Sequence, residues 1–160
     1  MRWIDRLFSL EEINGGERCP TYLYRWTLWR AKRFSVYLHH FVGDDWSLDL
    51  HDHPKRFISI GLWGRYVEQS MQPLRFWRTQ YYDGLIQQLR EVERTYRAPW
   101  VRTFPATHIH RLQLIDGKPC WTLVIVLKPV RPWGFWHDGK FIGWREYVGS
   151  KLADKMKACD

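Results

Sequence analysis

The chain has 160 residues, a length that suits one domain with a sizeable core. Hydrophobic residues make up 45% of it, which excludes an intrinsically disordered chain. The net charge of +8 is spread along the sequence rather than gathered in runs, so it favours a soluble basic surface over a nucleic-acid-binding tract.

The sequence also bears on where the protein works. No apolar run approaches the roughly 20 residues that a membrane-spanning helix needs. The first residues lack the apolar stretch and the cleavage site of a signal peptide. Cys19, Cys120 and Cys159 are odd in number and are not spaced as a zinc motif. We therefore expect a cytoplasmic protein with no membrane partner.

Several segments alternate between apolar and polar residues in the manner of half-buried strands. The 11 Trp, 8 Tyr and 8 Phe suit such strands, because flat rings pack well on a pleated surface. In chain order, the predicted strands are residues 22–29, 34–42, 56–63, 100–104, 111–115 and 120–127.

Two Asp-Gly pairs mark turns, since Gly accepts the positive φ that a tight hairpin demands. Asp116-Gly117 predicts a hairpin between 111–115 and 120–127, and Asp138-Gly139 predicts one between 133–136 and 141–147. Residues 85–92 have helical spacing but also suit a strand, and 149–158 suit a short helix. Many short strands and few helices indicate a single all-β domain over 1–160, with a sandwich or barrel over roughly 20–148.

Two His-x-His pairs stand out, His51-Asp52-His53 and His108-Ile109-His110. Residues two apart in a strand point to the same side, so each pair can aim both imidazoles at one point. If the two strands are neighbours in a barrel, three or four imidazoles converge, and neutral imidazole is a good ligand for Fe, Zn, Ni or Cu. By contrast, the adjacent His39 and His40 have no such spacing. The pattern predicts one divalent transition-metal site.

The segment from His51 to Glu68 resembles the first motif of the cupin family, in which a His-x-His pair precedes a Glu and then a Gly. Gly64 falls where that Gly belongs, whereas Phe57 and Ile58 occupy the positions of the Glu. The wider frame, roughly residues 34–147, is similar to small cupins of bacteria and their phages.

Residues 105–110 resemble the second cupin motif, Pro-x-Gly-x-x-His, with Thr107 in place of its Gly and Leu114 in place of a later Asn. The resemblance implies a double-stranded β-helix, the jelly-roll barrel of cupins, with one or two short helices. It also implies that His110 is a metal ligand together with His51 and His53. His108 is then either a fourth ligand or a group beside the ligands or the substrate.

The missing Glu would leave the dication without a compensating charge among its ligands. Cupin dioxygenases with three-histidine sites are known, so the resemblance still favours Fe(II), with Zn, Ni or Mn as alternatives.

Other polar side chains are candidates for roles beside the metal. Glu68 is a general base, a partner of a ligand imidazole or, in the simplest interpretation, a solvent-facing strand end. Tyr66 is a candidate acid and, with Trp63, a candidate wall of a pocket. Arg56 and Arg102 are candidates to hold a carboxylate or phosphate of the substrate.

These features favour a metal-binding cupin that acts as a non-haem Fe(II)-dependent dioxygenase on a small anionic substrate. One alternative keeps the fold without the metal, as a sugar-nucleotide epimerase or isomerase with a His base and Tyr66 as the acid. Another is a non-catalytic module that binds nucleic acid or a partner protein through its basic and aromatic surface. The Trp-rich surface also permits a homodimer.

Overall fold

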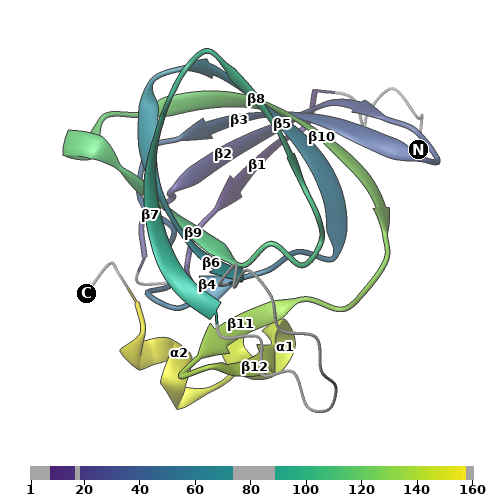
Figure 1. The fold of residues 1–160 in the computed structure, drawn as a ribbon. Helices are drawn as coiled ribbons and strands as arrows, with labels where there is room; N and C mark the ends of the chain where they lie inside the picture. The colour runs from purple at the N-terminus through teal and green to yellow at the C-terminus, as the bar shows by residue number, and fades with distance from the viewer. Residues whose placement is uncertain (1–7, 17–18, 74–88, 158–160) are drawn as a thin grey trace, which may run out of the picture.

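A computed structural model describes residues 8–16, 19–73 and 89–157. Within them, two antiparallel six-stranded sheets face each other around a common interior, and Figure 1 looks into this barrel. The first sheet has the order β1-β2-β3-β10-β5-β8, and the second has the order β12-β11-β4-β9-β6-β7. The strands are β1 Leu10–Ile13, β2 Leu23–Arg30, β3 Phe34–Phe41, β4 Leu50–His51, β5 Lys55–Trp63, β6 Arg65–Pro73, β7 Leu89–Arg97, β8 Trp100–Phe104, β9 His110–Leu114, β10 Cys120–Pro129, β11 Gly134–His137 and β12 Lys140–Gly143.

The central strand β10 of the first sheet carries mostly apolar residues on both of its faces. Thr122, Val124 and Val126 of this strand line the interior, whereas the residues between them face the other way. On that other face the Trp121 ring stacks on His40, with the centroids 4.0 Å apart. The all-β barrel predicted from the alternating segments is confirmed.

The two Asp-Gly turns have different outcomes. Asp138 and Gly139 have φ values of 47° and 74°, and they join β11 to β12 as the predicted hairpin. Asp116 and Gly117 also adopt positive φ, at 57° and 62°. However, β9 pairs with β4 and β6, while β10 pairs with β3 and β5. The hairpin predicted there is wrong, because this turn carries the chain from one sheet to the other.

The C-terminal region differs from the prediction. The strand expected over 141–147 ends at Gly143, and α1 (Trp144–Val148) follows at once. Ser150 then caps α2 (Lys151–Lys155) by accepting a hydrogen bond from Ala153 N at 3.2 Å. α2 lies within the range 149–158 where one short helix was expected, and α1 is an additional helix before it. α1 brings the fully buried Tyr147 onto the Phe135 ring, with the centroids 4.0 Å apart. No helix in the described ranges is long and apolar enough to span a bilayer.

Two further boundaries differ as well. β1 pairs with β2, so the first sheet begins before residue 20. The part of the 85–92 segment that the structure describes belongs to strand β7, and Leu85 lies outside the described residues.

A buried carboxylate anchors the first His-x-His segment to the second sheet. Asp52 is fully buried, and its Oδ1 accepts a hydrogen bond from Gly134 N at 3.0 Å. Its Oδ2 accepts from Arg131 Nη1 and from Trp136 Nε1. Because Asp52 lies between the two histidines of the pair and is held by β11 and the residues before it, the backbone of the pair is fixed in place.

We predict that Asp52→Ala lowers the free energy of unfolding by about 2 to 4 kcal/mol, because the buried Gly134 N loses its acceptor and the half-buried Arg131 guanidinium loses its carboxylate partner. Urea denaturation followed by tryptophan fluorescence measures the change. Asp154 is an exposed carboxylate paired with Lys157, so Asp154→Ala is the control and should cost less than about 1 kcal/mol. Equal losses in the two variants would contradict the anchoring role of Asp52.

Candidate metal centre and its cavity

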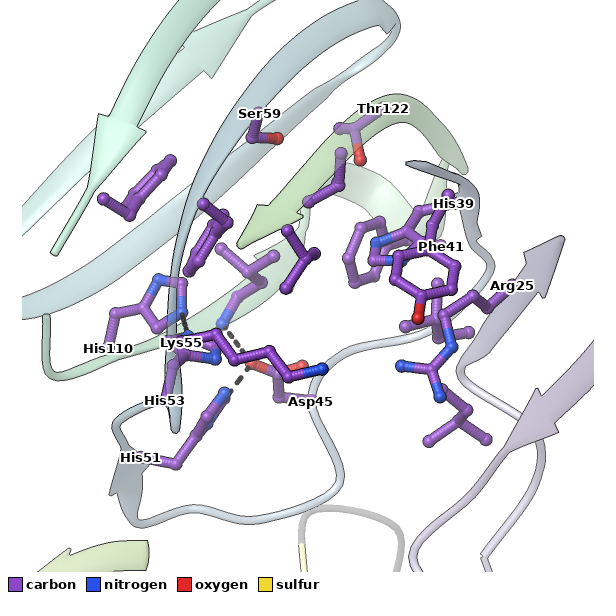
Figure 2. Close-up of a pocket in the computed structure, with 18 of the residues that line it drawn as sticks. Arg25, His39, Phe41, Asp45, His51, His53, Lys55, Ser59, His110 and Thr122 are labelled. Atoms are coloured by element: carbon purple, nitrogen blue, oxygen red, sulfur yellow. Dashed lines mark hydrogen bonds and ion pairs between the residues drawn. The ribbon is translucent and has the colours of Figure 1, made fainter. Parts of the chain in front are cut away.

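A cavity of about 520 Å³ lies between the two sheets, within the usual size range of ligand pockets. Its wall is mostly apolar, with Val124 contributed by the first sheet and Leu112 by the second. Figure 2 shows three histidines grouped at one side of this space. The cavity therefore combines an apolar interior with one concentrated polar site, which is the usual composition of a small-molecule pocket.

The three histidines come from two segments that the topology brings together. His51 of β4 is the direct cross-strand partner of His110 of β9, and His53 follows β4. One ring nitrogen from each of the three lies within 4.8 Å of the others, and His53 Nε2 is 2.8 Å from His110 Nε2. Nitrogens at that separation share either a proton or a metal ion. These three side chains could hold a divalent transition metal.

Glu68 of β6 orients the imidazole of His110. Its Oε1 lies 2.7 Å from His110 Nδ1 and 2.9 Å from His108 Nε2. A proton on His110 Nδ1 is donated to this carboxylate, which leaves the Nε2 lone pair of His110 facing the other ligands. Glu68 is only 2% exposed, so the interpretation of this residue as a solvent-facing strand end is wrong.

Arg102 of β8 forms an ion pair with the same carboxylate. Its Nη2 donates to Glu68 Oε2 at 2.6 Å, and its guanidinium carbon lies 3.7 Å from the centroid of the Tyr96 ring. Burial alone would raise the pKa of Glu68, but hydrogen bonds from His108, His110 and Arg102 hold this pKa well below its usual range. Glu68 is therefore a permanent anion, suited to orienting an imidazole and a poor proton acceptor for a substrate. Arg102 is committed to Glu68 rather than free for a substrate.

Tyr66 lies beside this network and lines the cavity. It is 4% exposed, and its hydroxyl lies 3.5 Å from Arg102 Nη1. Burial, together with the charge of Glu68, raises the pKa of the Tyr66 phenol well above its ordinary value. The phenol therefore keeps its proton at neutral pH.

The imidazoles of His51 and His53 are neutral at pH 7. Burial lowers the pKa of His51 to about 4, although Asp45, whose Oδ2 is 4.0 Å from His51 Nδ1, opposes this shift. Burial and the neighbouring imidazoles also lower the pKa of His53 well below its usual value. Neutral imidazole is the form that binds metals. Asp45 and Glu68 supply two carboxylates beside the three imidazoles, so they offset part of the charge of a bound dication.

His108 belongs to a second group, with Glu68 and His110, rather than to the group of His51 and His53. Asp45, which sequence reasoning missed, lines the cavity before the first His-x-His pair. Its only signal in the sequence is the acidic pair Asp44-Asp45, a pattern that is common on protein surfaces.

Two of the predicted substrate-binding residues lie away from the cavity. In β5, Lys55 and Phe57 line the cavity, whereas Arg56 between them is exposed, because successive residues of a strand face opposite sides. Trp63 is 60% exposed. A bulge at the end of β5 pairs Trp63 with Trp121, so the indole sits on the outer side of the sheet and not in the pocket.

His39, which carries no motif in the sequence, lines the cavity from β3. Its neighbour His40 stacks on Trp121 on the other face of the sheet. The adjacent pair is thus split between the two faces by the period of the strand.

No family model matches the chain, and no curated protein sequence matches it. Among solved structures, the oxalate decarboxylase of Lactobacillus farciminis in a formate complex aligns with a TM-score of 0.51 at 12% identity, over 77% of this chain and 31% of its own length. A sugar phosphate isomerase of the cupin superfamily from Silicibacter pomeroyi aligns with a TM-score of 0.49 at 16% identity, over 73% of this chain and 66% of its own. The fold is that of a cupin. At these identities the likeness concerns the fold alone.

The cupin barrel of this chain therefore keeps a histidine cluster at the inner wall and places its carboxylate differently. The Glu expected a few residues after the first pair is absent from β5, where Phe57 packs instead against His53, with the ring centroids 4.8 Å apart. Glu68, on the next strand, approaches His110 from the side away from His53.

The histidines of this barrel should titrate very differently. Burial and the charge of Arg25 lower the pKa of His39 from 6.5 to about 3. A hydrogen bond to Asp49 raises the pKa of His137 above 6.5. Between pH 6.5 and about 3 the unfolded chain takes up a proton at residue 39 that the folded chain excludes, so this group lowers stability as the pH falls.

We predict that, as the pH is lowered, the His39 ring of the metal-free protein keeps the NMR shifts of the neutral form down to about pH 3. His137 should instead take up its proton before the pH has fallen to 6.5. His39→Leu should also flatten the loss of stability on acidification. An ordinary midpoint near 6.5 for His39 would contradict the buried position assigned to it.

Proposed function

We propose that this cupin is a metal-dependent oxidoreductase, a non-haem Fe(II) dioxygenase that acts on a small anionic substrate. The supporting observation is the convergence of three imidazoles, those of His51, His53 and His110, on the wall of a mostly apolar cavity. This donor set, with no carboxylate among the three, suits Fe(II), Zn, Ni or Cu, whereas Mn prefers oxygen ligands. When bound, such a metal supplies redox or Lewis-acid chemistry.

The residues around the donor set would define how the substrate sits. Lys55 lines the cavity and has no ion-pair partner among the described residues, so it is the best placed cation for an anionic group of the substrate. Tyr66 would donate a hydrogen bond, since its phenol keeps its proton. The apolar wall would exclude bulk water, which strengthens the interaction of Lys55 with an anion.

Glu68 and Arg102 take positioning roles in this proposal. The carboxylate of Glu68 holds the ring of His110 and selects its tautomer, and Arg102 neutralises that carboxylate. His108 shares the same oxygen of Glu68, so we place it beside the ligands rather than among them. Partners of metal-ligating histidines commonly affect metal affinity in this way.

The metal is tested first. Protein purified without added metal should contain about one equivalent of a transition metal by mass spectrometry, and His51→Ala should reduce this to less than about 0.1 equivalent. His40→Ala, on the outer face of the sheet, is the matched control and should keep the metal. Full occupancy in His51→Ala would contradict the donor set.

The positioning role of Glu68 makes a separate prediction. Glu68→Gln keeps the shape of the side chain but removes its charge, so the affinity for Zn²⁺ measured against a competing chelator should fall roughly 10- to 100-fold. Glu93→Gln changes an exposed residue of β7 that is bonded to Gln69, and it should leave the affinity unchanged. Unchanged affinity in Glu68→Gln would refute the role.

The reaction is tested by oxygen uptake. Fe(II)-loaded protein should consume O₂ only when a suitable organic anion is present, and His110→Ala should lower the rate by more than about 100-fold. A metal-free protein that turns over a substrate at the wild-type rate would instead favour acid–base catalysis by an epimerase or isomerase. Localisation in the cytoplasm, a homodimer and binding of nucleic acid stay predictions.

A further inference from the structure

The wall of the cavity away from the histidine cluster carries polar atoms without a partner. Thr122 is 3% exposed, and neither its Oγ1 nor the Nε2 of His39 has a hydrogen-bond partner among the described residues. Both residues line the same cavity as His51, His53 and His110, and Figure 2 shows them at its opposite side. Buried polar groups are normally paired, because an unpaired one costs free energy. These two atoms therefore point to a ligand.

The unpartnered atoms belong to one row across the first sheet. Arg25 of β2 is the direct cross-strand partner of His39 on β3, and His39 is the direct partner of Thr122 on β10. Side chains opposite each other on one face lie within contact distance. Ser59 of β5, 6% exposed, adds another hydroxyl to the same wall of the cavity. Ser59 lies opposite Val124, two residues along β10 from Thr122, so this wall presents the imidazole and hydroxyl of the row and a second hydroxyl beside it.

This wall carries little free charge. The guanidinium of Arg25 donates through Nη2 to Glu11 Oε2 at 2.5 Å, so its positive charge is already paired, although its Nε has no partner among the described residues. The imidazole of His39 is neutral, as its burial requires. A carboxylate or ammonium group placed here would lose its hydration without gaining a counter-charge. A hydrocarbon end would leave the Thr122 and His39 atoms unpaired. An uncharged group that forms hydrogen bonds fits both conditions.

Much of the remaining wall is apolar, with Phe41, Val124 and Leu112 among its residues. The volume of about 520 Å³ accommodates a ligand of on the order of ten to fifteen non-hydrogen atoms.

We propose that the cavity binds an elongated organic acid, with its carboxylate at the histidine end near Lys55 and an uncharged hydroxyl or carboxamide held by His39 and Thr122. The histidine end of this inference rests on the proposed function, whereas the His39–Thr122 end stands on its own contacts.

The test uses matched probes on the full chain. A series of ω-hydroxy carboxylic acids of about four to ten carbons, the plain fatty acids of equal length and the corresponding dicarboxylic acids are titrated by calorimetry. We expect the best ω-hydroxy acid to bind about 10-fold or more tightly than the plain acid of the same length, and the dicarboxylic acid to bind more weakly. Equal affinities, or no binding of any probe, would overturn the proposal.

Two substitutions locate the effect. Thr122→Val keeps the volume and removes the hydroxyl, and His39→Leu removes the imidazole, so each should abolish most of the preference for the ω-hydroxy acid. Thr103→Val and His40→Leu are the controls on exposed or outward positions and should retain it. Thr122→Val should also match or exceed the wild-type melting temperature, because it removes an unpaired buried hydroxyl. A preference that persists in Thr122→Val and His39→Leu would refute the subsite.

The same titrations separate this inference from the proposed function. They are run with metal-loaded and with metal-free protein, beside the measurement of bound metal. If the protein binds no metal but still prefers the ω-hydroxy acid in a way that depends on Thr122, the subsite is supported and the metal centre is refuted. If the protein binds metal stoichiometrically but shows no such preference, the metal centre is supported and the subsite is refuted.

Discussion

The candidate site depends on one buried carboxylate. Glu68 accepts hydrogen bonds from His110 and His108 through one oxygen and from Arg102 through the other. A charge that is 2% exposed persists in a barrel only when cations or donors compensate it, and these three side chains do so. In return the carboxylate fixes which nitrogen of His110 carries the proton. The chemistry available at the cavity wall follows from that choice of tautomer.

A second carboxylate fixes the opposite half of the cluster from outside. Asp52 points away from the cavity and binds Gly134 N, the guanidinium of Arg131 and the indole of Trp136. Through it the β11–β12 hairpin holds the His51–His53 segment against the barrel. The C-terminal elements seen beneath the barrel in Figure 1 thereby support the site. Trp133, just before β11, lines the cavity, and the Phe135 ring centroid is 6.0 Å from that of His51.

The cavity keeps polar atoms that the fold itself does not require. A valine at 122 would pack as well as the threonine, and the hydroxyl finds no partner among the described residues. Unpaired polar atoms in a core lower stability, and natural proteins tolerate them mainly where function needs them. The cavity wall differs in this respect from the cluster of Phe135, Tyr147 and Ala153, where the buried Tyr147 hydroxyl is bonded to Asp49 and Ser47.

Local alternation was enough to predict that the chain forms short strands and that each His-x-His pair can present its rings on one face, because the period of a strand is a local property. The sequence also indicated the positions of the turns at Asp116 and Asp138, whose positive φ suits Asp-Gly. The tertiary structure alone decided that β9 and β10 lie in different sheets, that a bulge turns Trp63 outward, and that Glu68 meets His110 across paired strands. These outcomes depend on which strands pair when two sheets close over a shared interior, and that choice is made by contacts between residues far apart in the chain.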